Sequence, residues 1–97
     1  MITTKQRAEL RAMANSIDTI FQIGKGGIGD ALIKQVEDAL KARELIKMRV
    51  LVNSVFSAKE AAQEISQKTD SDVVQVIGTK FVLYKKNEKE PVIKLSK

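Results

Sequence analysis

Two spacings of apolar residues alternate along this chain, and their order restricts the fold that it can adopt. Apolar side chains recur with helical spacing in residues 4–15, 30–43 and 57–68, whereas residues 19–23, 45–52, 73–77 and 80–85 have the character of strands. The strand–helix–strand order, used twice, predicts parallel pairing with right-handed crossovers, and the last two strands are expected to form an antiparallel hairpin. The predicted fold class is therefore α/β, an α-β-α-β-α-β-β sandwich of two or three layers with a mixed four-stranded sheet.

Short local motifs indicate where several of these elements begin and turn. Two predicted helix starts carry the Ser or Thr, followed three residues later by Glu or Gln, that forms a capping box. These pairs are Thr3 with Gln6 and Ser57 with Glu60. Gly78 and Thr79 separate the last two strands, and glycine at the first of these positions suits a type II′ hairpin. Residues 87–97 form a charged tail, in which a proline permits at most a short edge strand.

The segment 45–52 alternates as a half-buried strand does. Its apolar face is expected to comprise Ile46, Met48, Val50 and Val52. Lys47 and Arg49 fall on the opposite face. They would either extend a track for nucleic-acid phosphates or simply be solvated, and the sequence favours neither interpretation.

Four glycines fall within six residues, between a predicted strand and a predicted helix, in the segment IGKGGIGD of residues 23–30. Glycine lets a ligand approach the backbone closely, and a helix start presents free N–H groups and a partial positive charge. Lys25 adds a mobile positive charge at the loop tip. Together these features favour a phosphate-binding loop over a plain connector.

Three phosphate-binding motifs compete for this segment. From Gly24 to Gly29 it matches G-x-G-x-x-G, but the dinucleotide fingerprint also requires an acidic residue near the end of the second strand, where Asn53 stands. The P-loop motif fails because no Lys-Ser or Lys-Thr pair follows the glycines. The third motif is the G-x-x-G loop with which KH domains clamp a nucleic-acid backbone. Its members here are Gly24, Lys25, Gly26 and Gly27.

Composition supports a polyanionic partner and gives little support to catalysis. Seventeen Lys and Arg face twelve Asp and Glu, for a net charge of +5, and the chain contains no His and no Cys. The commonest general base, the commonest metal ligand and the Cys-based zinc sites are therefore missing, and we expect neither an enzyme nor a cofactor. Aromatic residues make up 4% of the chain, so recognition of RNA backbone and shape is expected rather than base stacking. Phe21 and Phe81 are expected in the core, and Tyr84 either stacks a base or packs its ring.

Basic residues outside the loop complete the candidate site. Lys34 lies one turn beyond the loop, and Arg7 belongs to a basic strip on the first helix, for which an ordinary charged helix face is the alternative. The predicted RNA-binding residues are Gly24, Lys25, Gly26, Gly27, Lys34, Lys47, Arg49 and Arg7. The first residues include no apolar signal region, and no apolar run approaches the length of a membrane span. The expected location is therefore the cytoplasm, without membrane contact.

The stretches FQIGKGGIGDALIKQVEDALKARELIKMRVLV and VVQVIGTKFVLYKK resemble the bacterial YhbY family of single CRM domains, the chloroplast RNA splicing and ribosome maturation type. The resemblance covers residues 4–95. Its most specific parts are residues 24–27, 44–47, 76–78 and 83–85. Lys85 stands where the family often has arginine, which keeps the charge and loses the planar guanidinium.

The resemblance implies one RNA-binding domain over residues 1–97, with a fold similar to the C-terminal domain of translation initiation factor 3. It also implies association with ribosomal RNA in precursors of the large ribosomal subunit, and a monomer is the default expectation. Two other functions stay open from the residues themselves. One is a small nucleotide- or dinucleotide-binding domain that uses the same loop, and the other is a protein-interaction module on the ribosome.

Overall fold

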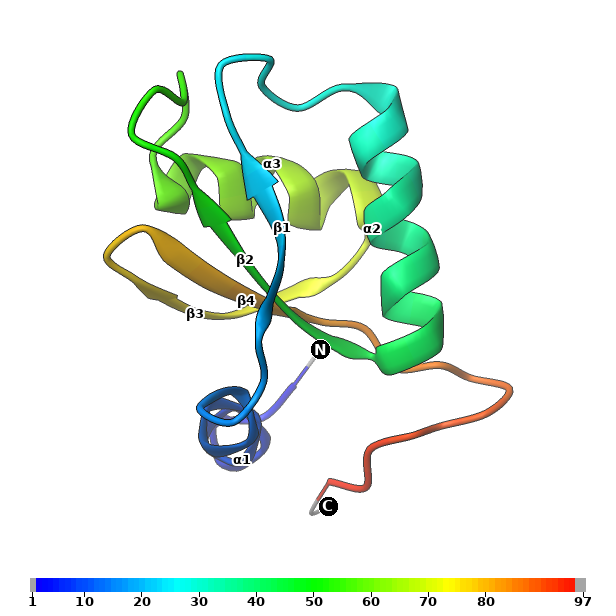
Figure 1. The fold of residues 1–97 in the computed structure, drawn as a ribbon. Helices are drawn as coiled ribbons and strands as arrows, with labels where there is room; N and C mark the ends of the chain where they lie inside the picture. The colour runs from blue at the N-terminus through cyan, green and yellow to red at the C-terminus, as the bar shows by residue number, and fades with distance from the viewer. Residues whose placement is uncertain (1, 96–97) are drawn as a thin grey trace.

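The computed structural model describes residues 2–95 and contains three helices and four strands, in the predicted order (Figure 1). The helices are α1 (Thr4–Ala14), α2 (Asp30–Arg43) and α3 (Ala58–Thr69), and the strands are β1 (Thr19–Ile23), β2 (Leu45–Val50), β3 (Asp72–Ile77) and β4 (Lys80–Tyr84). Both predicted capping boxes are present, so the backbone amides at the starts of α1 and α3 have acceptors. Gly78 has a φ of +59° in the two-residue turn between β3 and β4, as a type II′ hairpin requires.

The four strands form one mixed sheet in the order β1-β2-β4-β3. β1 and β2 pair in parallel, whereas β4 pairs antiparallel with both β2 and β3. The predicted parallel pairing is therefore confirmed for β1 and β2 and wrong for β2 and β3, because β4 lies between them. The reason lies in the side chains of β4, of which the last four are buried, whereas β3 ends in two exposed residues. A strand that is apolar on both faces is best buried at the centre of a sheet, and β3 tolerates the edge.

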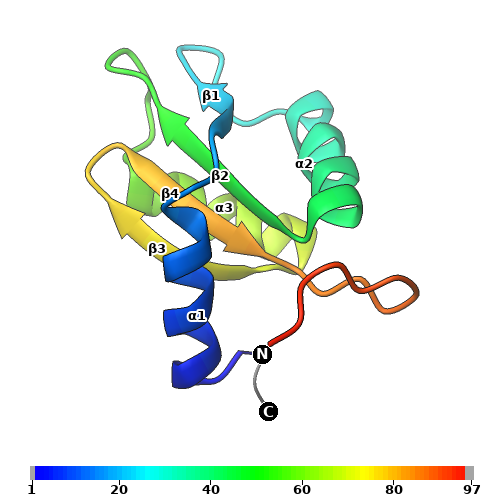
Figure 2. The ribbon, with the colours of Figure 1, turned by 60° about the horizontal axis from the view of Figure 1, so that its bottom comes forward.

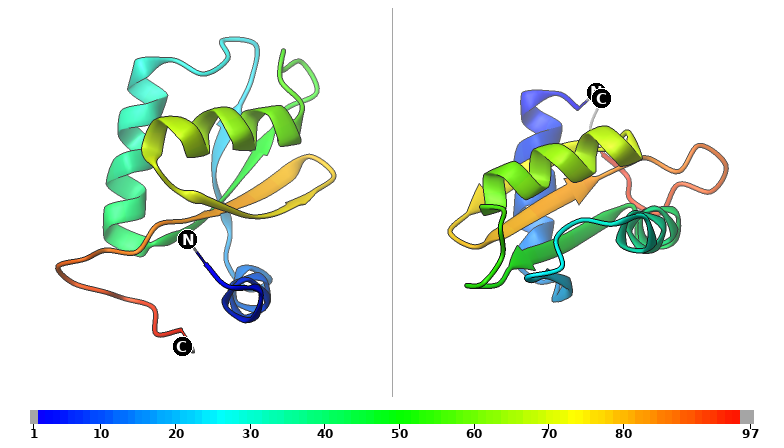
Figure 3. Two further views of the ribbon diagram at one scale, coloured as in Figure 1. Left: turned by 180° about the vertical axis from the view of Figure 1, so that it is seen from behind. Right: turned by 90° about the horizontal axis from the view of Figure 1, so that it is seen from above.

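The sheet is covered on both faces, which makes the sandwich three layers deep. α2 and α3 lie against one face and α1 lies across the other (Figures 2 and 3). The larger core, between the sheet and the helices α2 and α3, includes Val36, Leu40, Ile46, Met48, Ile65, Phe81 and Leu83. The smaller core, beneath α1, comprises Leu10, Ala14, Leu45, Val74, Val82 and Tyr84. Phe81 is thus buried as predicted, and Phe21 packs against the larger core.

β2 ends two residues earlier than the sequence predicts. Val52 was expected on the buried face of this strand, but it is fully exposed, at 106%. Strand pairing stops because β4 begins only at Lys80 and β1 ends at Ile23, so residues beyond Leu51 have no neighbouring strand. The chain turns there instead, and the amide of Ser54 donates to the carbonyl of Leu51 at 3.0 Å.

The C-terminal segment is held by a buried carboxylate that sequence reasoning did not select. Glu44 ends α2 with a φ of +64°, and its side chain is completely buried. Its carboxylate accepts hydrogen bonds from the backbone amides of Asn87, Val92 and Ile93, at 2.6–2.7 Å. The described part of the tail forms no strand, within the limit set by the proline, because these amides bond to Glu44 rather than to a strand.

Tyr84 provides an optical probe of the smaller core, since it is the only tyrosine and the chain has no Trp. Its ring is 4% exposed and therefore packs in the core rather than stacking a base. Burial raises the pKa of the Tyr84 phenol above its ordinary value, and the charges of Glu44, Asp72 and Glu88 act in the same direction.

The folded protein therefore holds the Tyr84 proton more tightly than the unfolded chain does. This contribution to the free energy of unfolding is present below the ordinary tyrosine pKa of 10.0 and is lost as pH rises through the higher folded pKa. We expect a tyrosinate absorbance titration to have a higher midpoint in buffer than in concentrated urea. Equal midpoints would contradict the burial of this phenol.

Candidate nucleic-acid interface

The glycine loop, residues 24–29, lies at one end of the sheet with two other connecting segments. β1 and β2 are parallel, so the glycine loop and the segment after β2, residues 51–57, leave the sheet side by side (Figure 1). We call the second segment the valine turn. The hairpin between β3 and β4 reaches the same end, where the amide of Val50 donates to the carbonyl of Thr79 at 2.8 Å. These three segments are called the glycine end of the molecule.

The glycine loop leaves backbone donors open to a ligand. The amide of Gly27 closes a tight turn onto the carbonyl of Gly24 at 3.1 Å, and Gly27 has a φ of +72°, which strongly favours glycine. Within residues 2–95, the amides of Lys25, Gly26 and Ile28 have no protein acceptor. A Cβ added at Gly26 would meet no heavy atom within 4 Å, so the fold does not require glycine there.

The start of α2 strengthens the attraction for an anion. Gly29 is the N-cap residue and offers no side-chain cap to the first amides of the helix. These amides and the helix dipole create a positive potential next to the loop. Asp30, in the first turn, partly offsets that potential.

The two lysines predicted nearest the loop differ in their surroundings. Lys25 is exposed, and residues 2–95 give it no ion pair. Lys34 lies one turn into α2 and pairs with Asp38 at 3.4 Å, with both side chains largely exposed. A pair of this kind is weak in water, so Lys34 can exchange its carboxylate partner for a phosphate at little cost.

Lys47 and Arg49 lie on the sheet face that α1 partly covers, and both are half-buried. Arg49 is the nearer of the two to the glycine loop, because it pairs across the strands with Gln22. With the Gln22 amide oxygen turned toward it, the Arg49 guanidinium donates two hydrogen bonds, at 2.9 and 3.3 Å. Lys47 lies two residues earlier in β2 and therefore farther from the glycine loop, between Thr19 and Val82 of the neighbouring strands.

The structure separates Arg7 from the other predicted residues. Its guanidinium donates to the carbonyl of Val73 and, at 3.4 Å, to that of Val74, on the edge strand β3. The pairing of β3 with β4 shifts register at this point. Arg7 therefore joins α1 to an irregular part of the sheet edge, away from the glycine loop.

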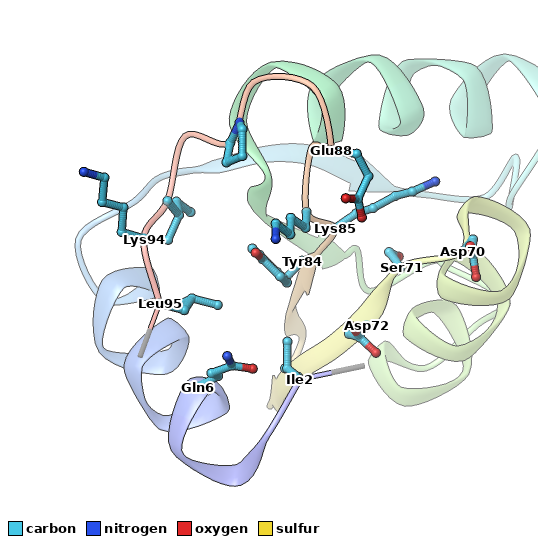
Figure 4. Close-up of a pocket in the computed structure, with 13 residues that line it drawn as sticks. Ile2, Gln6, Asp70, Ser71, Asp72, Tyr84, Lys85, Glu88, Lys94 and Leu95 are labelled. Atoms are coloured by element: carbon cyan, nitrogen blue, oxygen red, sulfur yellow. The ribbon is translucent and has the colours of Figure 1, made fainter. Parts of the chain in front are cut away.

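Charge is unevenly distributed around the glycine end. The glycine loop, the valine turn and hairpin residues 77–80 contain Lys25 and Lys80 and no acidic residue. Arg49 and Lys59 flank them, as do the acidic residues Asp30 and Glu60 in the first turns of α2 and α3. The groove beside the C-terminal segment is different, because Asp70, Asp72 and Glu88 line it together with Lys85, Lys86 and Lys94 (Figure 4). A polyanion is therefore attracted to the glycine end more strongly than to this groove.

The acidic partner expected of a dinucleotide site does not lie near the glycine loop. The valine turn follows β2 without an acidic residue, and Glu44 is engaged by the C-terminal segment before β2 begins. Residues 2–95 contain no group of three or more Asp or Glu placed to hold a metal ion. Within the same range, no helix has the length and apolar character needed to span a bilayer.

Sequence reasoning missed the valine turn as a neighbour of the glycine loop. The signal was available, since the segments that follow two adjacent parallel strands meet at one edge of the sheet. The prediction of a longer β2 concealed it by assigning Val52 to the core. Glu44 belongs to one of the most specific parts of the family resemblance, but no local pattern indicates its hydrogen bonds, because its partners are 43 to 49 positions away in the chain.

Comparison with known proteins finds a family model and named relatives that match nearly the whole chain. The family model described as the CRS1 / YhbY (CRM) domain matches residues 2–85. The chain is 43% identical over 95 residues to "Probable RNA-binding protein YqeI" of Bacillus subtilis, covering 98% of this chain and 99% of that protein. It is 28% identical over 91 residues to a protein of Haemophilus influenzae named "RNA-binding protein", covering 94% and 92% of the two chains.

A solved structure agrees with the fold over its full length. The solution structure of a hypothetical protein from Staphylococcus aureus, described as a candidate RNA-binding protein, has a TM-score of 0.81 and 48% sequence identity. The match covers 99% of this chain and 100% of that one.

Proposed function

Because this chain belongs to the CRS1/YhbY (CRM) domain family, we propose that it binds RNA without catalysing a reaction and that the glycine loop holds the RNA backbone. The observation that carries the proposal is a loop with open amides at a helix start, tipped by Lys25, which has no ion pair within residues 2–95. Phosphate is the RNA group that such donors recognise. The names of its relatives support RNA as the partner.

The proposed contacts form a short track that starts at the loop. The Gly24–Gly27 backbone and Lys25 hold one phosphate, Lys34 takes a neighbouring one, and Arg49 continues the track along β2 toward Lys47. Arg7 is left out of the proposed contacts, since its guanidinium is engaged by β3.

The proposed RNA is precursor ribosomal RNA of the large subunit, as the family resemblance implies. The protein would act as a monomer in the cytoplasm, by occupying the RNA during assembly and then leaving. Crosslinking in cells, followed by sequencing of the attached RNA, tests this target. We expect one dominant site on precursor ribosomal RNA. Crosslinks scattered over messenger RNAs would contradict the assembly role, and a partner that stays bound after nuclease treatment would indicate a protein-held complex.

Lys25→Ala tests the loop as the contact. Loss of one charged contact is expected to weaken binding by about 1 kcal/mol, or roughly fivefold. It should also lower the salt-dependence slope by about 0.7–0.9, because one phosphate fewer is neutralised. Fluorescence anisotropy with labelled RNA at several salt concentrations measures both values.

Lys41→Ala is the matched control for Lys25→Ala. Lys41 is an exposed lysine in the last turn of α2, remote from the glycine loop, and its replacement removes the same charge. We expect the control to change the slope much less. If the salt dependence of RNA affinity has the same slope for Lys25→Ala as for the unmodified protein, the glycine loop does not contact the RNA.

A further inference from the structure

Exposed aliphatic side chains gather at the glycine end. Among residues 2–95, the large hydrophobic side chains with high exposure are Val52 at 106%, Val55 at 72%, Ile77 at 63%, Val92 at 60% and Val76 at 39%. All except Val92 belong to the valine turn or to the hairpin end of β3. A small domain ordinarily keeps such side chains apart, so a group of them beside basic residues indicates a binding surface.

The valine turn presents its valines on a backbone with several defined hydrogen bonds. The amide of Leu51 donates to the carbonyl of Ile23 at 2.8 Å, and that of Phe56 donates to the Ser54 hydroxyl oxygen at 3.0 Å. Phe56 packs against the larger core, and Ser57 begins the capping box of α3. The exposure of Val52 and Val55 is therefore set by a turn that is anchored at both ends.

The valine turn also touches the glycine loop. A Cβ at Gly27 would lie 3.6 Å from Phe56 Cε2 and 3.9 Å from Val55 Cγ2. A Cβ at Gly24 would lie 3.4 Å from Leu51 Cδ1 and 3.7 Å from Asn53 Oδ1. The two segments lie side by side in two views of the molecule (Figures 1 and 2). A nucleotide whose phosphate rests on the glycine loop would thus have the valine turn beside its sugar and base.

The charge and the apolar side chains of this surface together fit one class of ligand. The three segments contain Lys25 and Lys80 and no acidic residue, which suits a polyanion, while Val52 and Val55 need an apolar partner. A duplex presents phosphates, 2′-hydroxyls and paired base edges, none of which matches exposed valines. An unpaired nucleotide offers both a phosphate and the flat apolar face of a base.

We infer that the valine turn is the second half of the RNA site, and that Val52 and Val55 contact the base of an unpaired nucleotide whose phosphate lies on the glycine loop. The inference rests on the proposed function and extends it, because it names single-stranded RNA as the ligand class. Affinity for unpaired RNA then has an apolar component in addition to its electrostatic one.

The test compares two probes of equal length, a mixed-sequence single-stranded RNA and a blunt RNA duplex. The variant is the full chain that carries both Val52→Thr and Val55→Thr. Threonine keeps the shape of each valine side chain and replaces a methyl group with a polar hydroxyl. We expect about tenfold weaker binding of the single strand, from lost apolar burial, and a much smaller loss with the duplex. The salt slope should not change, since no phosphate contact is removed.

Val92→Thr is the control, because Val92 is an exposed valine in the C-terminal segment, away from the glycine end. Circular dichroism establishes that each variant is folded, and Val55→Thr alone replaces the double variant if that one unfolds. Equal losses on both probes, or no loss on either, overturn the inference. A loss of binding only to ribosomal particles, with unchanged affinity for free RNA, also overturns it in favour of a protein partner.

The same assay separates this inference from the proposed function. If Lys25→Ala lowers the salt slope while the valine variant binds normally, the glycine loop remains the contact and only the inference fails. If Lys25→Ala has no effect on binding or slope, the proposed function fails as well.

Discussion

Replacing Glu44 with alanine is expected to lower the free energy of unfolding by about 2–4 kcal/mol and to release the C-terminal segment from the domain. The carboxylate is completely buried and accepts three backbone hydrogen bonds, from Asn87, Val92 and Ile93. A charged acceptor makes each of these bonds stronger than a neutral one would be. Alanine would leave three amide groups without an acceptor unless the segment moves into water.

A second substitution separates charge from shape at Glu44, and a third, elsewhere in the C-terminal segment, is the control. Glu44→Gln keeps the size of the side chain but replaces one acceptor oxygen with a donor that faces an amide donor, so a loss of about 1–3 kcal/mol is expected. Glu90→Ala is the control, because Glu90 is an exposed acidic residue of the same segment and, within residues 2–95, only its backbone amide is hydrogen-bonded. Its effect should stay within about 0.5 kcal/mol.

Urea unfolding followed by circular dichroism measures these energies, and hydrogen exchange of the Val92 and Ile93 amides reports the release of the segment. Unchanged exchange protection in Glu44→Ala would show that other contacts hold the segment. Residual RNA binding by the folded fraction is expected to remain near that of the unmodified protein, because Glu44 and the glycine loop lie at different ends of β2.

Replacing Gly26 with aspartate is expected to weaken RNA binding by about 10- to 100-fold without lowering stability appreciably. The new carboxylate would stand where the proposed phosphate lies, and its charge would repel the RNA. A Cβ at this position meets no heavy atom within 4 Å, and the φ of Gly26 is not positive, so a side chain there is not expected to lower the free energy of unfolding. Gly27 would be a poor choice for this test, because its φ of +72° makes any side chain there strained.

Gln67→Asp is the matched control for the added charge. Gln67 is an exposed residue on α3, outside the glycine end, and the substitution changes the net charge from +5 by the same amount. Gly26→Ala should fall between the control and Gly26→Asp, since a methyl group hinders close approach but does not repel phosphate. Equal affinities for Gly26→Asp and Gln67→Asp would exclude a phosphate at this loop.

Local patterns in the sequence were sufficient for the type and order of the elements, although β2 ends two residues before its predicted boundary. The order of helices and strands, both capping boxes and the hairpin at Gly78 were predicted and are confirmed. Each depends on residues within a few positions of one another, where periodicity and hydrogen bonding are set by the neighbouring sequence. The glycine loop, with Lys25 at its tip, was selected for the same reason, and its contact with RNA stays a prediction.

The sequence by itself therefore determined the order of helices and strands, the α/β class and the position of the glycine loop between β1 and α2. The tertiary structure alone decided that β4 lies between β2 and β3, and that Arg7 and Glu44 have structural partners. The bonds of Glu44 span 43 to 49 positions and the bond from Arg7 to Val74 spans 67. No local pattern records contacts of that range, because they arise only when the sheet brings distant segments together and buried polar groups must find acceptors.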